Sequence, residues 1–210
     1  MSNQQQTANG ADIQPAIPAQ MAEDFRAVCR DAWTQGLLSG CNGNASQRLG
    51  GHAPNLICIT RSGASKGRLA TADCCLMDVN TGAAVLGGPA STESGMHLAI
   101  YRTRPDCTAI LHTHPRRLLA LSLRLADRHE DFLRLPLFEA DVWRAKLGFA
   151  PALPPGTTDL AEAVAEAAKG KDAVWMEGHG LCCLGRSLSD ALCLAEELEH
   201  LAALQILATA

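Results

Sequence analysis

The chain has 210 residues, of which 47% are hydrophobic, and a formal net charge of -4. This length is sufficient for one α/β domain with a substantial core. The charge excludes a broad basic surface for nucleic acid, and no apolar run is long enough to span a membrane. The polar N-terminus lacks the basic-then-apolar pattern of a signal segment, so we expect a cytoplasmic location.

The nine cysteines lie mostly within apolar runs, and none forms a Cys-x-x-Cys pair. Neighbours such as Cys74 and Cys75 would point to opposite faces of a strand, which makes them poor joint ligands for a metal. We interpret the cysteines as reduced, buried thiols that serve as small apolar residues, rather than as a disulfide framework.

The predicted elements begin after a polar, proline-containing segment, residues 1–19, which we expect to be a flexible arm before a single domain over residues 20–210. In chain order, the sequence predicts a helix over 21–38, a loop over 41–46, a strand over 55–60, a glycine loop over 61–67, a hairpin of strands 75–79 and 83–86, and a helix from about 91 to 104. Ser39-Gly40 would end the first helix, and Ser91 or Thr92 would cap the last.

The second half of the chain continues with alternating strands and helices. The sequence predicts a strand over 107–114, a helix over 116–125, a strand over 133–137, a helix over 157–169 capped at its start, strands over 173–176 and 181–184, and a final helix from Ser187 onward. Hairpin-linked strands among helices favour a largely antiparallel or mixed sheet over regular βαβ winding.

Two histidines, His112 and His114, end the apolar strand that is stopped by Pro115. Alternate side chains of a strand share a face, so both imidazoles would point the same way and could chelate one metal ion. His179 stands between two glycines after another strand and is a candidate third ligand, which would leave an open position typical of a catalytic site. Taken alone, His179 is better explained as a turn histidine.

Glu93 stands at the start of a predicted helix, where a carboxylate is favoured by the helix dipole. Near a metal, the same carboxylate could act as a general base or as a further ligand. His97, four residues later on the same helical face, is better explained by packing or by support of the site than by metal ligation. Ordinary capping is thus an alternative to catalysis for Glu93.

Three segments carry hydroxyls, amides and exposed backbone N–H groups that suit phosphate oxygens: residues 43–46, residues 62–66 and Ser91-Thr92 at a helix start. The second segment lacks the order of residues found in a nucleotide P-loop. Each segment alone is better explained by ordinary turn chemistry.

Taken in order, these pieces resemble the class II aldolase/adducin family, from about Met21 to the last helix. The resemblance rests on the combination of Ser91-Thr92-Glu93, His112-Thr113-His114 and a late Gly178-His179-Gly180. It is supported by residues 43–46, 59–63, 97–101 and 104–105.

The resemblance implies a three-layer α/β/α fold with a central, mostly antiparallel sheet. It also implies a homotetramer whose active sites lie between neighbouring subunits. A divalent metal, usually Zn²⁺ with Mn²⁺, Co²⁺ or Fe²⁺ as alternatives, would be held by His112, His114 and His179. Glu93 would be the catalytic acid/base. The phosphate of a small sugar phosphate would be bound by Asn44, Ser62, Gly63, Ser91 and Thr92.

The activity implied is cleavage of a short ketose 1-phosphate, fuculose-phosphate-like or a deoxypentulose phosphate, to dihydroxyacetone phosphate and an aldehyde. A dehydratase, decarboxylase or epimerase of a sugar phosphate on the same scaffold is the alternative, although an epimerase would be expected to carry Asp in place of Glu93. A non-catalytic adducin-like interaction module is a third reading, against which the retained histidines argue.

The chain departs from bacterial fuculose-phosphate aldolases in one respect. Those enzymes carry a tyrosine after the second histidine, whereas the single tyrosine of this chain is Tyr101, on the predicted helix after Glu93. The proton donor to the departing aldehyde is therefore unassigned, with Glu139, Asp141 and Lys146 as the candidates.

Overall fold

Eight strands and six α-helices form the structure, a computed structural model that describes residues 15–51, 53–126 and 128–209. The strands are β1 (Asn44–Arg48), β2 (Leu56–Thr60), β3 (Cys74–Asp78), β4 (Ala84–Leu86), β5 (Ala109–Thr113), β6 (Leu147–Ala150), β7 (Ala173–Met176) and β8 (Gly180–Gly185). The helices are α1 (Ala19–Thr34), α2 (Ser94–Thr103), α3 (Arg116–Arg124), α4 (Phe138–Ala145), α5 (Thr158–Ala167) and α6 (Leu188–Ala208), with short 3₁₀ turns at Lys66–Arg68, Thr71–Asp73 and His129–Asp131.

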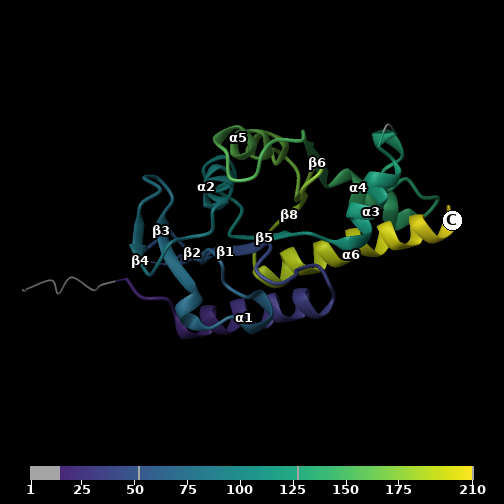
Figure 1. The fold of residues 1–210 in the computed structure, drawn as a ribbon. Helices are drawn as coiled ribbons and strands as arrows, with labels where there is room; N and C mark the ends of the chain where they lie inside the picture. Colours follow the sequence, from purple (N-terminus) through teal and green to yellow (C-terminus); the bar gives the residue numbers. More distant parts are fainter. Residues whose placement is uncertain (1–14, 52, 127, 210) are drawn as a thin grey trace, which may run out of the picture.

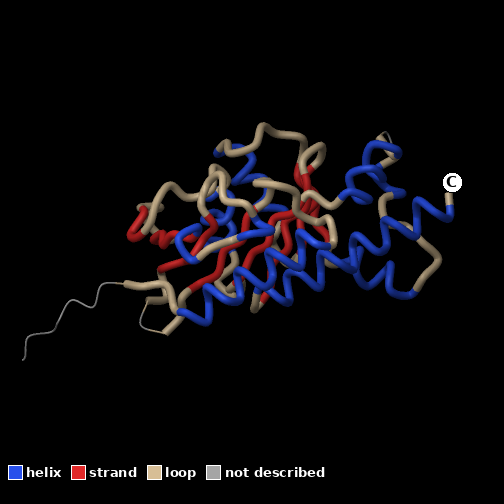
Figure 2. Tube along the Cα trace, turned by 60° about the horizontal axis from the view of Figure 1, so that its bottom comes forward, coloured by secondary structure: helices blue, strands red, loops and turns tan. Residues whose placement is uncertain are grey.

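The strands form one sheet in the order β4-β3-β2-β1-β5-β8-β7-β6. Every neighbouring pair is antiparallel except β6 and β7, which run parallel. Helices α2 and α5 cover one face, and α1 and α6 cover the other, so the sheet lies between two helical layers (Figures 1 and 2). The predicted three-layer, mostly antiparallel α/β/α fold is confirmed.

Two hydrophobic cores lie on the two faces of the sheet, and the strands contribute alternate residues to each. In β5, Ala109 and Leu111 pack with residues of α1, α3 and α6, whereas Ile110 packs with residues of α2 and α5. This follows from the period of two along a strand. It also places His112, two residues after Ile110, on the α2 face.

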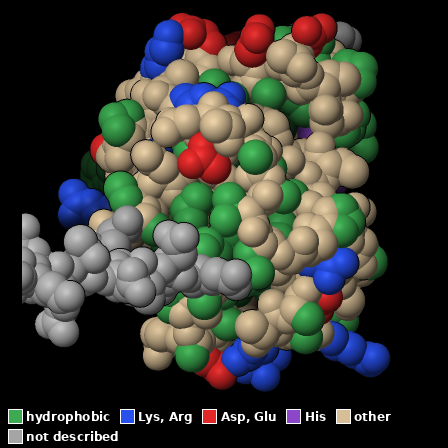
Figure 3. Space-filling view, turned by 90° about the vertical axis from the view of Figure 1, so that its left-hand side faces the viewer, with side chains coloured by type: hydrophobic (Ala, Val, Ile, Leu, Met, Phe, Trp, Pro, Cys, Tyr) green, Lys and Arg blue, Asp and Glu red, His purple; other side chains and the backbone are tan. Residues whose placement is uncertain are grey.

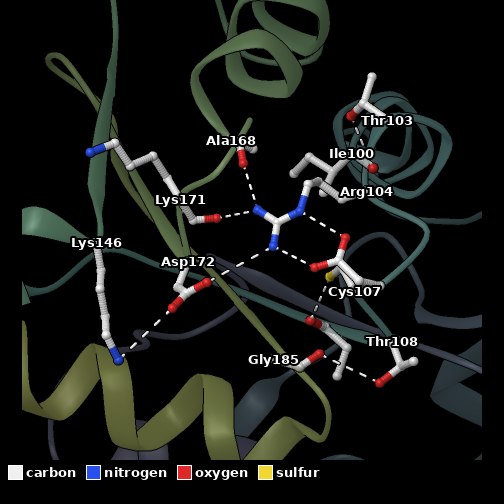
Figure 4. Close-up of polar contacts among 12 residues, drawn as sticks. Ile100, Thr103, Arg104, Cys107, Thr108, Lys146, Ala168, Lys171, Asp172 and Gly185 are labelled. Carbon is white, nitrogen blue, oxygen red and sulfur yellow. Dashed lines mark hydrogen bonds and ion pairs between the residues drawn. The ribbon is translucent and has the colours of Figure 1, made fainter.

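Arg104, directly after α2, fastens this helix to its neighbours (Figure 4). Its guanidinium donates to the carbonyl of Ala168 at the end of α5, at 2.6 Å, and to the carbonyl of Lys171. It also pairs with both carboxylate oxygens of Asp106, at 2.9 and 2.7 Å. The pair with Asp106 fixes the orientation of the guanidinium. Its bonds to Ala168 and Lys171 tie the C-terminal end of α2, the helix that Glu93 precedes as its N-cap residue, to the end of α5.

Several predictions about strands were wrong. The predicted strand over residues 133–137 does not form: Leu133 has a left-handed φ of 57°, and Pro136 cannot donate to a ladder. Two strands were missed. β1 lies partly in the predicted loop 41–46, because its side chains are polar, and β6 is a four-residue edge strand with no alternation to reveal it.

Helix boundaries were predicted with mixed success. Thr157 and Ser187 cap α5 and α6 as predicted, since their hydroxyls accept from the backbone N–H groups of Leu160 and Asp190. The first helix ends at Thr34, ahead of the predicted Ser39-Gly40, and neither Ser91 nor Thr92 caps α2, because Glu93 occupies that position.

Two expectations concern the ends and surface of the chain. Most of the predicted N-terminal arm, residues 1–14, lies outside the described residues. Among the residues that the structure describes, no helix combines the length and the apolar character needed to cross a bilayer.

Candidate metal centre and active site

Three histidines from two neighbouring strands converge at one end of the sheet. His112 lies in β5, His114 directly follows it, and His179 lies in the turn between β7 and β8. Their ring centroids are 4.7, 4.9 and 5.2 Å apart, and one nitrogen of each lies within 4.8 Å of the others. Gly180 makes this approach possible, since a Cβ there would lie 2.5 Å from the carbonyl oxygen of Thr113.

Ring nitrogen atoms of the three histidines face one another at short distances. Nδ1 of His112 lies 3.0 Å from the carbonyl oxygen of Leu181 and must donate to it. Its Nε2 therefore points at Nε2 of His114, 3.0 Å away, and at Oε2 of Glu93, 3.3 Å away. A proton or a metal ion must separate these atoms. Ligand nitrogens of a tetrahedral zinc site are about 3.4 Å apart, so the three imidazoles fit a divalent cation.

His114 has the electronic state that a metal ligand needs. Burial, with the neighbouring His112 and His179 acting in the same direction, lowers the pKa of His114 to about 3. The imidazole is therefore neutral near pH 7 and keeps a lone pair free for coordination.

Glu93 is a buried carboxylate at the start of α2 that reaches two of the histidines. Its Oε1 lies 3.0 Å from Nε2 of His179, and its Oε2 accepts a hydrogen bond from the amide of Asn44 at 2.8 Å. Burial alone would raise the pKa of Glu93, but the contacts with His112 and His179 outweigh it and hold this pKa well below its usual range. Glu93 is therefore ionised and acts as a hydrogen-bond acceptor.

A cavity of about 280 Å³ opens beside these groups. Every residue predicted to bind the metal or the phosphate or to act as the acid/base lines it except His112, which is fully buried beside His114 and Glu93. The structure thus brings the three polar segments together with the histidines. The lining contributed by the predicted residues consists of Asn44, Ser62, Gly63, Ser91, Thr92, Glu93, His114 and His179.

The cavity also has residues that were not predicted individually as site residues, although Lys66 ends the predicted anion-binding segment 62–66. Lys66 is only 1% exposed, and its ammonium donates to the carbonyls of Cys41 at 3.2 Å and Ala64 at 2.7 Å, which ties two of the cavity loops together. Burial lowers the pKa of Lys66. Arg61 and Pro155 also line the cavity. The polar glycine loop contained Lys66 and Arg61, but nothing in the sequence indicated that Lys66 is buried, and Pro155 comes from a distant loop.

The candidate proton donors Glu139, Asp141 and Lys146 lie elsewhere, in or just after α4, and none of them lines this cavity. Lys146 sits over the ring of Trp143 and 3.9 Å from Asp172, in the polar cluster around Arg104 (Figure 4). The described chain therefore does not bring any of the three to the histidines.

Comparisons with known proteins agree with this architecture. The family model for the class II aldolase and adducin N-terminal domain matches residues 23–206. An L-fuculose phosphate aldolase of Methanococcus maripaludis is 33% identical over 181 residues, which cover 86% of this chain and 93% of that protein. A methylthioribulose-1-phosphate dehydratase of Sodalis glossinidius is 33% identical over 196 residues, covering 87% and 93%.

A solved structure shows the same fold. The sugar-phosphate aldolase of Thermotoga maritima superposes with a TM-score of 0.79 at 25% identity, over 91% of this chain and 97% of that one. Both the sequence comparisons and the structural comparison therefore confirm the resemblance expected from the spaced motifs. The chain belongs to the class II aldolase and adducin family.

Proposed function

We propose that this protein is a metal-dependent aldolase that cleaves a short ketose 1-phosphate to dihydroxyacetone phosphate and an aldehyde. One observation carries the proposal: the ionised Glu93 faces two of three convergent histidines, beside a cavity lined by hydroxyls and backbone amides. The substrate is fuculose-phosphate-like or a deoxypentulose phosphate.

His112, His114 and His179 would hold the metal, with Zn²⁺ the best match to three imidazoles and Mn²⁺, Co²⁺ or Fe²⁺ as alternatives. When bound, the ion supplies Lewis-acid polarisation of the substrate's carbonyl oxygen. The contact from Nδ1 of His112 to the carbonyl of Leu181 orients that ring, as carbonyl partners of ligating histidines commonly do.

Glu93 would serve as the acid/base at the carbon next to the carbonyl. In the synthesis direction it takes a proton from dihydroxyacetone phosphate, and in the cleavage direction it returns that proton. Its depressed pKa supports the carboxylate form that such a base requires, and its position at the cavity wall places it beside a bound substrate.

The phosphate would be bound by Asn44, Ser62, Gly63, Ser91 and Thr92. Hydroxyl and backbone N–H donors recognise phosphate oxygens without any need for a nucleotide-type loop. The buried ammonium of Lys66 adds positive charge beneath the same loops, which supports an anionic ligand there.

We further propose a homotetramer with active sites between subunits. Exposed apolar side chains support association: Phe138 of α4 is 95% exposed, and Val85 and Leu86 are exposed on the edge strand β4. Figure 3 views the molecule from the β4 end and shows hydrophobic side chains gathered in the middle of that face. A neighbouring subunit would then supply the proton donor that this chain lacks at its own site.

We infer that residues 20–210 form one domain, which the single eight-stranded sheet supports. We also infer a cytoplasmic location. The nine cysteines are all free thiols, and most are buried, as is usual for proteins of a reducing compartment.

A dehydratase is the second candidate. The Sodalis glossinidius dehydratase matches this chain at the same 33% identity as the aldolase of Methanococcus maripaludis, so overall similarity does not select the reaction. A decarboxylase or epimerase on this scaffold would use the same histidines.

A product screen separates these reactions. Metal-loaded protein is incubated with a panel of ketose 1-phosphates, and the products are identified by mass. Formation of dihydroxyacetone phosphate with an aldehyde supports the proposal. Loss of water or of carbon dioxide selects the second group, and turnover of none of the substrates by metal-loaded protein would favour an interaction module.

A further inference from the structure

A chain of buried polar side chains runs from Glu93 into the protein, between β1 and α2. Asn44 contacts His97 at 2.5 Å, His97 contacts Ser46 at 2.6 Å, and Ser46 contacts Tyr101 at 2.9 Å. All four side chains are at most 3% exposed. Buried polar groups of this kind are retained where each of them has a partner.

The direction of every hydrogen bond in this series of side chains follows from Glu93, at which the series begins. The carboxylate of Glu93 only accepts, so Nδ2 of Asn44 must donate to it, which turns Oδ1 of Asn44 toward His97. Nε2 of His97 must then carry the hydrogen, and its Nδ1 must accept from the hydroxyl of Ser46. The hydroxyl of Tyr101 donates to Ser46 and ends the chain.

The environment of His97 agrees with this single tautomer. Burial, with the neighbouring His112 acting in the same direction, lowers the pKa of His97 to about 3, so the ring is neutral near pH 7. Nε2 faces Oδ1 of Asn44, which can only accept a hydrogen bond, whereas Nδ1 faces the hydroxyl of Ser46, which can donate one. A flip of the ring would put Cδ2 and Cε1 in the places of Nδ1 and Nε2 and lose both hydrogen bonds.

The same constraint acts on Asn44, which lines the cavity. If its amide turned over, Oδ1 would face the carboxylate of Glu93 at hydrogen-bond distance, and two negative oxygens would repel each other. In the observed orientation, one N–H holds Glu93, and the second N–H of the same nitrogen is available for a substrate oxygen.

We propose that His97 is a positioning residue that, through Asn44, holds Glu93 in its working orientation and presents an amide N–H to the substrate. Ser46 and Tyr101 fix the ring of His97 in turn. This inference rests on the proposed role of Glu93. It extends that role by assigning a task to a histidine that neither binds the metal nor touches the substrate.

The tautomer provides a test that does not depend on activity. Zinc-loaded protein with ¹⁵N-labelled histidine is studied by long-range ¹H–¹⁵N correlation, with His97→Gln used to assign the His97 signals. We expect a protonated Nε2 and an unprotonated Nδ1 for His97 near pH 7. A protonated Nδ1, or a doubly protonated ring, would overturn the proposal even if the protein is an active aldolase.

Two variants test the functional part. The amide nitrogen of His97→Gln can reach the place of Nε2 and should keep kcat within about tenfold of the wild type, whereas the shorter His97→Asn should lose kcat by about 10–100-fold. KM should change less than kcat, since Ser62, Gly63, Ser91 and Thr92 do not depend on His97 and still line the proposed phosphate site. His200→Asn, an exposed histidine of α6, is the matched control.

The outcomes are distinguishable from a failure of the proposed function. A folded His97→Asn protein with wild-type kcat would contradict the positioning role while leaving the aldolase assignment intact. If His97→Asn does not fold, the tautomer measurement on the wild type decides. If the wild type cleaves no ketose phosphate, the proposed function fails, and the tautomer alone decides whether the hydrogen-bond chain exists.

Discussion

Oε1 of Glu93 lies 3.0 Å from Nε2 of His179, although Glu93 directly precedes α2 and His179 lies in the turn between β7 and β8. The carboxylate thus lies against a ring of the candidate metal centre. An ion held by the three histidines would therefore lie near this carboxylate. This relationship joins the candidate base to the candidate Lewis-acid site, and the predictions below depend on it.

Removal of any of the three histidines should abolish stoichiometric metal binding. His112→Ala, His114→Ala and His179→Ala are each expected to lower the zinc content after dialysis from about one ion per chain to near zero, because three protein ligands are the usual minimum for such a site. Elemental analysis gives the content, and His200→Ala is the control. Full zinc content in all three variants would show that the ion binds elsewhere.

Replacing Glu93 by Gln should separate metal binding from catalysis. Gln keeps the size of the side chain and a carbonyl oxygen but cannot take up a proton at neutral pH. We expect zinc to be retained and kcat to fall by about 10²–10⁴-fold, the usual contribution of a general acid or base. Steady-state kinetics on the substrate found in the product screen measures this. An unchanged kcat would assign the base to another residue.

The buried ammonium of Lys66 should matter for anion binding. In Lys66→Met, the carbonyls of Cys41 and Ala64 lose their donor, which we expect to lower the free energy of unfolding by about 1–3 kcal/mol. The loops would also separate, so inorganic phosphate should bind about tenfold more weakly. Urea denaturation and calorimetric titration measure the two effects. Lys169→Met, at an exposed lysine after α5, is the control, and equal phosphate affinity in both variants would contradict the role of Lys66.

The metal-free protein should lose stability as the pH falls below neutrality. The pKa of His97 is about 3 in the folded state and about 6.5 when unfolded, so the unfolded state binds the extra proton between these values. Between pH 7 and pH 5, this one group should remove about 2 kcal/mol of stability. His114, whose pKa is also lowered to about 3, acts in the same direction.

Urea denaturation of the wild type and of His97→Gln at pH 7 and pH 5 measures how much of the pH-dependent loss of stability is due to His97. The variant lacks the titrating ring, so its free energy of unfolding should fall by about 2 kcal/mol less than that of the wild type between pH 7 and pH 5. Equal losses in the two proteins would mean that His97 already titrates normally in the folded state.

The parts of the site that lie close together in the sequence could be predicted from it. His112 and His114 share a face because a strand alternates, and their pairing needs no knowledge of the fold. The approach of His179 is different, because it depends on β8 pairing with β5, which no local pattern encodes. The resemblance to a known family supplied that connection.

The polar strand β1 shows why other parts could not be predicted. Asn44 and Ser46 are buried in a central strand because they hydrogen-bond to residues of α2 and to Glu93, partners that are distant in sequence. A pattern of apolar alternation cannot find such a strand. The role of Asn44 as a link between His97 and Glu93 was hidden for the same reason.

The most direct test of the central claim is hydrogen exchange into dihydroxyacetone phosphate, which requires no knowledge of the aldehyde. Zinc-loaded protein is incubated with dihydroxyacetone phosphate in D₂O, and deuterium at the hydroxymethyl carbon is followed by ¹H NMR and mass. The account predicts replacement of one hydrogen by the wild type, and loss of this exchange in Glu93→Gln with zinc still bound. Absence of exchange with every candidate metal, or equal exchange in Glu93→Gln, would contradict it.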